Sequence, residues 1–322
     1  MATWADFNAA QDGVFHVRHA ILTFSGTWAA PGTGYCSWVA QAANQDLVFE
    51  VPVIAPWTFG FVQGAVDAPS YRQSVRIGVK WAVNWIEDHP GQTFMLGGYS
   101  QGAEAASRVF QELQAGGRLA DRRGDFVAGY TFGNPMRQAG HTFPGGGDPG
   151  GAGIATVQLQ DTPVEWHDHA NPGDMYTTTP FGQTGTIMRD VYEGLIDIQL
   201  NDPVGFAAAE VRALLTLMRD AGGSLPASML SQLGGAGTLI GIGGVFGGLG
   251  SFFGGEGGAQ TPGAVAAIQA AIIGLRFIST NPPTAPHITY EFAEAAPGIT
   301  HIAHAVNHVN QRAAQVTARA AA

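Results

Sequence analysis

Charged side chains are scarce in this sequence, and positive ones are the scarcer kind. Lysine and arginine together number 15, against 25 aspartates and glutamates in 322 residues, and the formal net charge is −10. A protein that binds nucleic acid needs a surface rich in lysine and arginine to neutralise phosphates. The composition therefore argues against a nucleic-acid partner, and it disfavours sustained contact with anionic lipid headgroups for the same reason.

Cysteine is nearly absent as well. Cys36 is the only one, so no intrachain disulfide can form, which fits synthesis in a reducing compartment. The first six residues carry neither the basic n-region nor the apolar h-region of a secretory signal. We therefore expect synthesis without a signal peptide, and a protein of this kind that acts outside a cell needs another route of release.

Hydrophobic residues, by contrast, make up 45% of the chain, which is enough for a large core. In the first half, short apolar runs alternate with stretches of helical periodicity, a pattern that predicts an α/β fold with a mostly parallel sheet. The expected strands are residues 20–24, 47–54, 93–99, 126–132 and 154–160. The expected helices in this half are residues 75–86 and 101–114.

The pattern changes after about residue 177. Helical periodicity returns at 204–220 and 264–277, and between them residues 233–258 contain 13 glycines in 26 positions with Glu256 as the single charge. So much glycine is incompatible with a membrane-spanning helix. A flexible, lipid-tolerant flap and a loop of low complexity both remain open as interpretations.

From Pro282 onward we expect the chain to return to the first domain. Its last helix is expected over 301–321, with Thr300 as the N-cap. The predicted organisation is thus an α/β core formed by 1–177 and 282–322, interrupted by a helical and glycine-rich insertion over 178–281.

The segment Gly98-Tyr99-Ser100-Gln101-Gly102 is the strongest chemical signal in the sequence. Gly-x-Ser-x-Gly places a serine on a sharp turn between a strand and a helix, where flanking glycines permit a strained backbone and leave room for substrate. The apolar run before it and the small-residue helix after it supply that context. Ser100 is therefore the predicted nucleophile.

A nucleophile of this type needs donors for the oxyanion of the tetrahedral intermediate. The Gln101 backbone N–H, at the start of the following helix, is the natural first donor. The second should come from Ser25-Gly26-Thr27, after the first strand, and we favour the Thr27 N–H with Ser25 as the fallback. Loss of one such donor typically costs about 3–4 kcal/mol of transition-state stabilisation.

The acid and the base must follow Ser100 in that order if the protein is an α/β-hydrolase. Four acidic residues lie between 161 and 174. Asp174 is preferred because the preceding Asn-Pro-Gly predicts a tight turn that fixes the carboxylate. Asp161, directly after the last expected strand, is the alternative, whereas Asp168 is interpreted as a solvated loop charge.

His287 is the predicted base, because the proline-rich segment before it predicts a rigid, non-helical approach. His301, His304 and His308 share one face of the last helix; a metal site is one interpretation, and a packed or polar helix face is the favoured one. His167 and His169 flank Asp168 and are placed in a loop beside the active site rather than in a metal site. No metal and no cofactor are expected.

Three motif blocks together carry a family resemblance. Gly98-Tyr99-Ser100-Gln101-Gly102-Ala103, Asn171-Pro172-Gly173-Asp174 and His287-Ile288-Thr289-Tyr290 resemble the blocks of the cutinase superfamily. Phe132-Gly133-Asn134-Pro135-Met136-Arg137 is similar to that group's Gly-Asn-Pro segment. Within the superfamily the chain looks most like the lysin B family of mycobacteriophage endolysins, and the blocks cover roughly residues 19–177 and 280–320.

That resemblance implies a mycolylarabinogalactan esterase, which cleaves the ester between mycolic acids and arabinogalactan of the mycobacterial cell wall. It also implies a cutinase-like α/β-hydrolase fold, synthesis in the host cytoplasm, release at lysis and peripheral contact with outer-membrane lipid. A cutinase or lipase acting on other lipid esters is the alternative. A non-catalytic envelope-binding phage protein is the third hypothesis, and labelling of Ser100 by a fluorophosphonate distinguishes it from an enzyme.

Overall fold

Five parallel strands form the central sheet of the computed structural model, in the order β2-β1-β3-β4-β5. The model describes residues 17–60, 65, 67–197, 266, 269–270, 273–274, 276–277, 280–282 and 284–319. The strands are β1 (His19–Phe24), β2 (Val48–Pro52), β3 (Phe94–Tyr99), β4 (Phe126–Phe132) and β5 (Trp166–His169). The predicted α/β-hydrolase architecture, with its parallel sheet, is confirmed.

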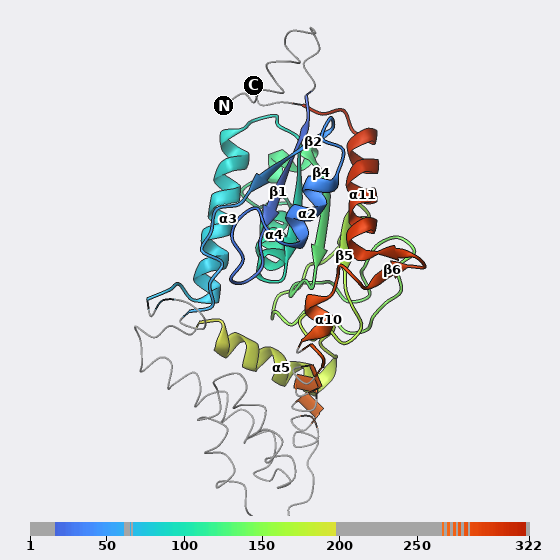
Figure 1. Cartoon of the computed structure of the whole chain (residues 1–322). Helices are drawn as coiled ribbons and strands as arrows, with labels where there is room; N and C mark the ends of the chain where they lie inside the picture. Colours follow the sequence, from blue (N-terminus) through green and yellow to red (C-terminus); the bar gives the residue numbers. More distant parts are fainter. Residues whose placement is uncertain are drawn as a thin grey trace, which may run out of the picture.

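Helices cover both faces of this sheet, as Figure 1 shows. They are α2 (Tyr35–Ala42), α3 (Tyr71–Asp88), α4 (Gln101–Glu112), the 3₁₀ helix η1 (Ala120–Asp125), α5 (Gly182–Leu195), α10 (Ala285–Ile288) and α11 (His301–Gln315). A small antiparallel hairpin, β6 (Glu294–Ala296) with β7 (Ile299–Thr300), precedes α11.

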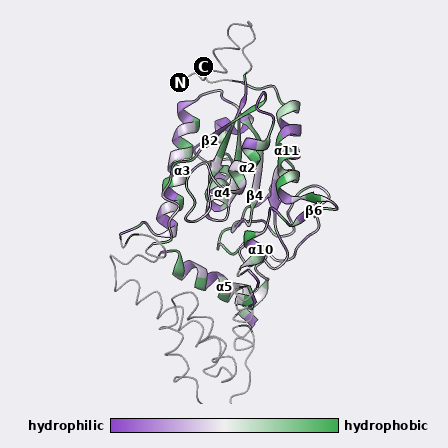
Figure 2. Cartoon of the chain, in the orientation of Figure 1, coloured by the Kyte–Doolittle hydropathy of each residue, from purple (hydrophilic) through white to green (hydrophobic). Residues whose placement is uncertain are grey.

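Alternation along the strands builds two hydrophobic cores, one on each face. Leu22 and Phe24 of β1 belong to the core shared with α3 and α4, while Ile21, directly before Leu22, belongs to the core shared with α2 and α11. All three are fully buried, as expected for a strand covered on both faces. Helices α3 and α11 mix hydrophobic and hydrophilic segments in Figure 2, as helices with one face on a sheet do.

Local sequence explains where the two long outer helices begin. The Ser70 side chain accepts from the Gln73 N–H (3.2 Å), and the Gln73 side chain accepts from the Ser70 N–H (3.4 Å). This reciprocal pair is a capping box at the start of α3. Thr300 accepts from the Ala303 N–H (3.2 Å) at the start of α11. The prediction of Thr300 as an N-cap is thus confirmed, although α11 ends at Gln315 rather than near 321.

The predicted strand over 154–160 is wrong. Hydrogen bonds from Ile154 to Tyr176, Ala155 to Pro135 and Leu159 to Met136 hold this segment in an irregular path. The fifth strand is Trp166–His169, whose polar sequence concealed it although all four residues are buried. Sequence reasoning also missed α2, α5 and the β6–β7 hairpin.

The glycine-rich segment 233–258 and the helix expected over 204–220 lie outside the described residues. Of the helix expected over 264–277, the described positions 266, 269–270, 273–274 and 276–277 are helical. The division into a core and an insertion therefore stays a prediction. None of the helices in the described part combines the length and the apolarity needed to cross a membrane.

Candidate active site

Ser100 occupies the sharp turn between β3 and α4, at the carboxyl end of the sheet. Its backbone has φ 54° and ψ −119°, a conformation that non-glycine residues rarely adopt. The Ser100 N–H donates to the Phe132 carbonyl at the end of β4 (3.0 Å), which ties the turn to the neighbouring strand. The predicted strand–turn–helix context of the motif is present.

The two motif glycines are there because the turn packs without space for a side chain. A Cβ on Gly98 would lie 2.6 Å from the Cα of Ala103, and one on Gly102 would lie 2.1 Å from the Phe24 carbonyl oxygen. Backbone atoms cannot yield as the end of a flexible side chain can. Both positions therefore require glycine for close contact, although neither has a positive φ.

Ser100, His287 and Asp174 form one continuous chain of hydrogen bonds. The Ser100 Oγ lies 2.9 Å from His287 Nε2, and His287 Nδ1 lies 2.9 Å from Asp174 Oδ2. Because a carboxylate only accepts, Nδ1 carries the proton and Nε2 is free to accept from the serine hydroxyl. This is the tautomer that a general base needs. The structure thus brings together the three residues predicted from sequence.

Short local elements fix the imidazole on several sides. His287 lies in α10, so the predicted non-helical approach is wrong; the proline that was expected to exclude helix sits within its first turn. The Tyr99 ring stacks on the imidazole with centroids 5.2 Å apart, and its hydroxyl donates to the His287 carbonyl (3.0 Å). The Tyr176 ring packs against it as well (4.7 Å). These contacts hold one rotamer of the base.

Asp174 is placed by the tight turn that the sequence predicted. Gly173 has φ 84°, and the Asp174 N–H donates to the Asn171 carbonyl (3.1 Å). The Asp174 side chain is fully buried. Asp161 is exposed and has φ 49°, and the carboxylate bonded to His287 is that of Asp174. Between the two acids that sequence reasoning left open, Asp174 is the one that meets the base.

Asp168 is fully buried in β5, so its interpretation as a solvated loop charge is wrong. It accepts hydrogen bonds from Thr131 (2.5 Å), Asn134 (2.8 Å) and His141 (3.0 Å). Burial acts to raise the pKa of Asp168, but the bonds from these three side chains bring it below its usual value. Asp168 therefore ties β4 and β5 to the Asn134 turn.

Of the predicted oxyanion donors, Gln101 directly follows Ser100, and Thr27 lies in the loop after β1. Gln101 is the first residue of α4, where helix geometry leaves its N–H without an intrahelical acceptor. The loop after β1 contacts the same turn, because a Cβ on Gly26 would lie 2.6 Å from the Tyr99 ring. The Ser25 hydroxyl donates to Ala30 (3.0 Å) and is turned into its own loop. The role of the Gln101 and Thr27 N–H groups stays a prediction.

Two further residues touch the triad without having been assigned a role from sequence. A Cβ on Gly133 would lie 2.7 Å from His287 Nδ1 and 2.9 Å from Asp174 Oδ2. The Tyr290 hydroxyl donates to Asp174 Oδ2 at 2.6 Å. Both stand in motif blocks that the sequence analysis singled out, and membership of a block was the only signal available for them.

Five further histidines form a cluster between β5 and α11. His167 and His169 belong to β5, so their placement in a loop is wrong; the members of the cluster are His167, His169, His301, His304 and His308. The His167 and His308 rings stack at 3.4 Å, and His169 Nδ1 lies 2.9 Å from His301 Nδ1. Within the part of the chain that the structure describes, no group of three or more His, Cys, Asp or Glu side chains is arranged to hold a metal.

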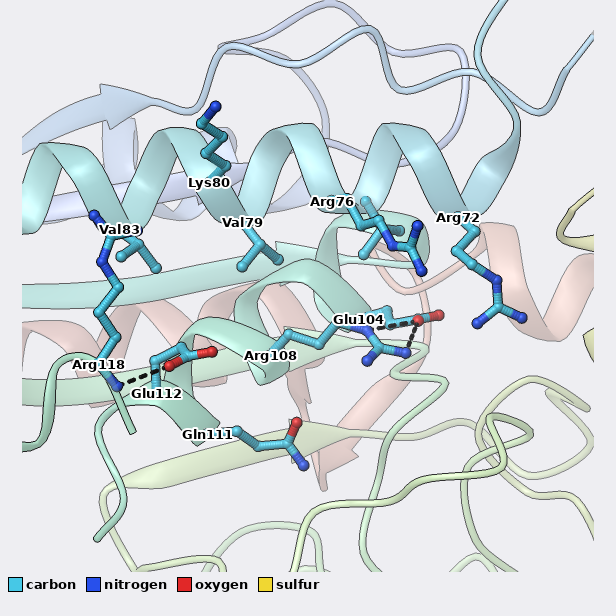
Figure 3. Close-up of a pocket in the computed structure, with 11 residues that line it drawn as sticks. Arg72, Arg76, Val79, Lys80, Val83, Glu104, Arg108, Gln111, Glu112 and Arg118 are labelled. Atoms are coloured by element: carbon cyan, nitrogen blue, oxygen red, sulfur yellow. Dashed lines mark hydrogen bonds and ion pairs between the residues drawn. The ribbon is translucent and has the colours of Figure 1, made fainter. Parts of the chain in front are cut away.

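A separate hollow of about 360 Å³ lies between α3 and α4, and Figure 3 shows its charged lining. Arg108 pairs with Glu104 (2.7 Å), and the Arg118 N–H donates to Glu112 (2.9 Å). None of the three triad residues lines this hollow. It is therefore distinct from the site around Ser100.

Comparison with known proteins gives similarities of fold. The PE-PPE domain model matches residues 48–160, and no curated protein matches the sequence. The crystal structure of lysin B from mycobacteriophage D29 is 21% identical and covers 79% of this chain and 98% of its own, with a TM-score of 0.49. A cutinase-like protein from a Cryptococcus species is 19% identical, covers 51% of this chain and 82% of its own, and has a TM-score of 0.37. An acetylxylan esterase is 18% identical, covers 56% of this chain and 99% of its own, and has a TM-score of 0.36.

Proposed function

We propose that this chain is a serine-dependent hydrolase of carboxylic esters, with Ser100 as nucleophile, His287 as base and Asp174 as the orienting acid. The observation that carries this is the unbroken chain of hydrogen bonds from the Ser100 Oγ through His287 to Asp174, with 2.9 Å at each step. Three segments far apart in the sequence converge to make it. A strained, positive-φ serine supports the same conclusion, because such strain gathers at functional sites.

The geometry supports acyl transfer in two halves. His287 Nε2 takes the Ser100 proton as Oγ attacks the ester carbonyl carbon, and the carbonyl oxygen becomes an oxyanion facing main-chain N–H groups. Collapse expels the alcohol, which receives the proton from His287. Water, deprotonated by the same imidazole, then releases the acid and restores Ser100. Asp174 stabilises the imidazolium that forms in each half.

For the substrate we propose the ester that joins mycolic acid to arabinogalactan. The support is the resemblance of the motif blocks to lysin B, together with exposed apolar side chains in the segments that carry the base and the predicted oxyanion loop. Ile288 directly follows the base in the sequence, Phe292 lies five residues after it, and Trp28 lies in the loop after β1; all three are exposed. Apolar residues at the mouth of a site suit a long acyl chain.

We also propose where the protein is made and where it acts. It would be made in the cytoplasm of a phage-infected host and released at lysis. It would then reach the cell wall and contact outer-membrane lipid peripherally. Hydrolysis of the mycolyl ester would detach the outer membrane and aid lysis.

Substitution of Ser100 by alanine tests the chemistry. Ser100→Ala should lower kcat on a soluble p-nitrophenyl ester on the order of 10⁶-fold and abolish fluorophosphonate labelling, with the fold intact by circular dichroism. Ser37→Ala is the matched control, because that buried hydroxyl has no hydrogen-bond partner among the described residues. Equal turnover by the wild type and Ser100→Ala would refute the triad.

A product analysis tests the substrate. We expect the wild type to release free mycolic acids from purified mycolyl-arabinogalactan faster than it hydrolyses cutin or triolein, and Ser100→Ala to release none. Faster hydrolysis of cutin or triolein would identify a cutinase or lipase instead and leave the esterase proposal standing.

A further inference from the structure

The carboxylate of Asp174 receives more hydrogen bonds than a triad requires. Its Oδ1 accepts from the Tyr176 N–H (3.1 Å), and its Oδ2 accepts from both His287 Nδ1 (2.9 Å) and the Tyr290 hydroxyl (2.6 Å). The shortest of these bonds is made by the tyrosine. Tyr290 therefore competes with the imidazole for the same oxygen.

The direction of the Tyr290 bond is fixed by its surroundings. The Asn171 N–H donates to the Tyr290 hydroxyl oxygen (3.3 Å), so the single phenolic hydrogen is left to point at Asp174. Burial, followed by the nearby charge of Asp174, raises the pKa of Tyr290 well above its usual value. The hydroxyl thus keeps its hydrogen at neutral pH and donates it to Asp174.

The Tyr290 ring has no freedom to turn away. It is fully buried and packs against Tyr35 (6.1 Å), Phe132 (5.7 Å) and His301 (5.4 Å) between ring centroids. It also follows His287 by three residues and is the second residue after α10. The base and the second donor to Asp174 are therefore held by one short segment.

We propose that Tyr290 is a positioning residue of the triad, which holds the Asp174 carboxylate in register with His287 and withdraws part of its charge from the imidazole. Tyr290 is enclosed by protein, so it acts through Asp174 and not on the substrate. A hydrogen bond to a charged group is worth more than a neutral one, and two donors on one oxygen share its charge. Without the hydroxyl, Oδ2 would serve His287 alone, so the bond to Nδ1 would strengthen while the carboxylate lost one of the contacts that orient it.

Tyr290→Phe tests this, and Tyr130→Phe is the matched control. Tyr130 is also fully buried and also donates one hydrogen bond, to the Cys36 carbonyl (2.8 Å), but it does not touch the triad. With a soluble ester, Tyr290→Phe should lower kcat about tenfold, or ~1.4 kcal/mol in barrier, with little change in KM. The acidic limb of its kcat/KM profile should move to higher pH. Tyr130→Phe should change neither.

The kinetic test rests on the proposed function, so a second readout is independent of it. In ¹H NMR spectra, the resonance of the His287 Nδ1 proton should move to lower field in Tyr290→Phe and stay in place in Tyr130→Phe. An unmoved resonance overturns the inference, whether or not the protein hydrolyses esters. An unchanged acidic limb in an active enzyme overturns it too. Absence of turnover and of fluorophosphonate labelling in the wild type would instead count against the proposed function.

Discussion

At the scale of single residues, Gly133 shows how closely the backbone approaches the triad. It follows β4 with φ 58°, and a Cβ there would collide with both His287 Nδ1 and Asp174 Oδ2, at 2.7 and 2.9 Å. The main chain at Gly133 thus packs directly against the hydrogen bond between Asp174 and His287. Any side chain at this position must push one of the two aside.

Gly133→Ala should therefore damage activity more than stability. We expect kcat/KM on a soluble ester to fall about 100-fold, because displacement of a catalytic group by about 1 Å has costs of that order. Gly145→Ala is the matched control, since Gly145 has φ 80° and open space around its Cα. Both variants bear the same backbone penalty, of about 1–2 kcal/mol. Equal activity of the two would show that Gly133 does not constrain the triad.

These residues also mark how far sequence could predict the site. Ser100 follows from its own neighbours, because a strand, two glycines and a helix specify the turn locally. Asp174 and His287 needed the chain order of a whole fold in addition to local turn signals. The roles of Gly133 and Tyr290 arise only where segments more than 100 residues apart meet (113 residues separate Asp174 from His287), and no local pattern reports such contacts.

At the scale of elements, the error over the last strand has a physical cause. Residues 154–160 have an apolar pattern, but the N–H groups of Ile154 and Ala155 donate to the carbonyls of Tyr176 and Pro135, which lie in loops and not in a strand. β5 has the sequence Trp-His-Asp-His. Its buried polar side chains form hydrogen bonds with partners such as Thr131, Asn134 and His301. A periodicity argument detects apolar burial and cannot detect polar groups whose partners lie elsewhere in the chain.

One buried carboxylate, Glu104, links helix α5 to both α3 and α4. Glu104 of α4, 2% exposed, accepts from Tyr192 of α5 (2.7 Å) and from Tyr71 of α3 (3.0 Å), and it pairs with Arg108 (2.7 Å). Arg72 adds an ion pair to Asp197 (2.6 Å), just beyond α5. Three helices are therefore joined at one point, four residues after Ser100.

Tyr192→Phe should loosen α5 selectively. A buried bond to a charged acceptor is worth about 1.5–3 kcal/mol, so we expect Tm to fall by roughly 4–10 °C. Hydrogen–deuterium exchange should increase in peptides from 182–197 and remain unchanged in peptides from β1 and β3. Tyr130→Phe, which loses a bond to a neutral carbonyl on the opposite side of the sheet, should leave exchange in α5 unaltered. Unchanged exchange over 182–197 in Tyr192→Phe would contradict the anchoring role.

At the scale of the whole molecule, the histidine cluster makes the packing of α11 on β5 depend on uncharged imidazoles. Burial lowers the pKa of His167 to about 2, with the neighbouring histidines adding to the effect, and it lowers the pKa values of His301 and His308 to about 4. The positive charge of Arg312 in α11 adds to the lowering of the His308 pKa. Of the carboxylates beside the cluster, Asp168 is engaged by His141 and Glu165 by Arg123.

The sign of the resulting pH dependence follows from linkage. In the unfolded chain these histidines take up protons near pH 6.5, whereas in the folded protein they stay neutral to about pH 4 or below. Their contribution to stability is complete well above pH 6.5 and is lost as the pH falls through 6.5 toward 4. Each such histidine removes up to about 1.4 kcal/mol of unfolding free energy per pH unit in that window.

Urea unfolding at pH 7.5, 6.5, 5.5 and 4.5 measures this directly. We expect the unfolding free energy to fall by about 1 kcal/mol from 7.5 to 6.5 and then to fall more steeply. His167→Leu, which removes a buried ring whose Nδ1 has no partner among the described residues, should reduce the slope by about one proton, or ~1.4 kcal/mol per pH unit. His89→Gln, at the end of α3 and outside the cluster, should keep the wild-type slope. If stability stayed flat down to pH 4.5, the cluster would have to be protonated in the folded protein, and the packing of α11 on β5 could not depend on neutral rings.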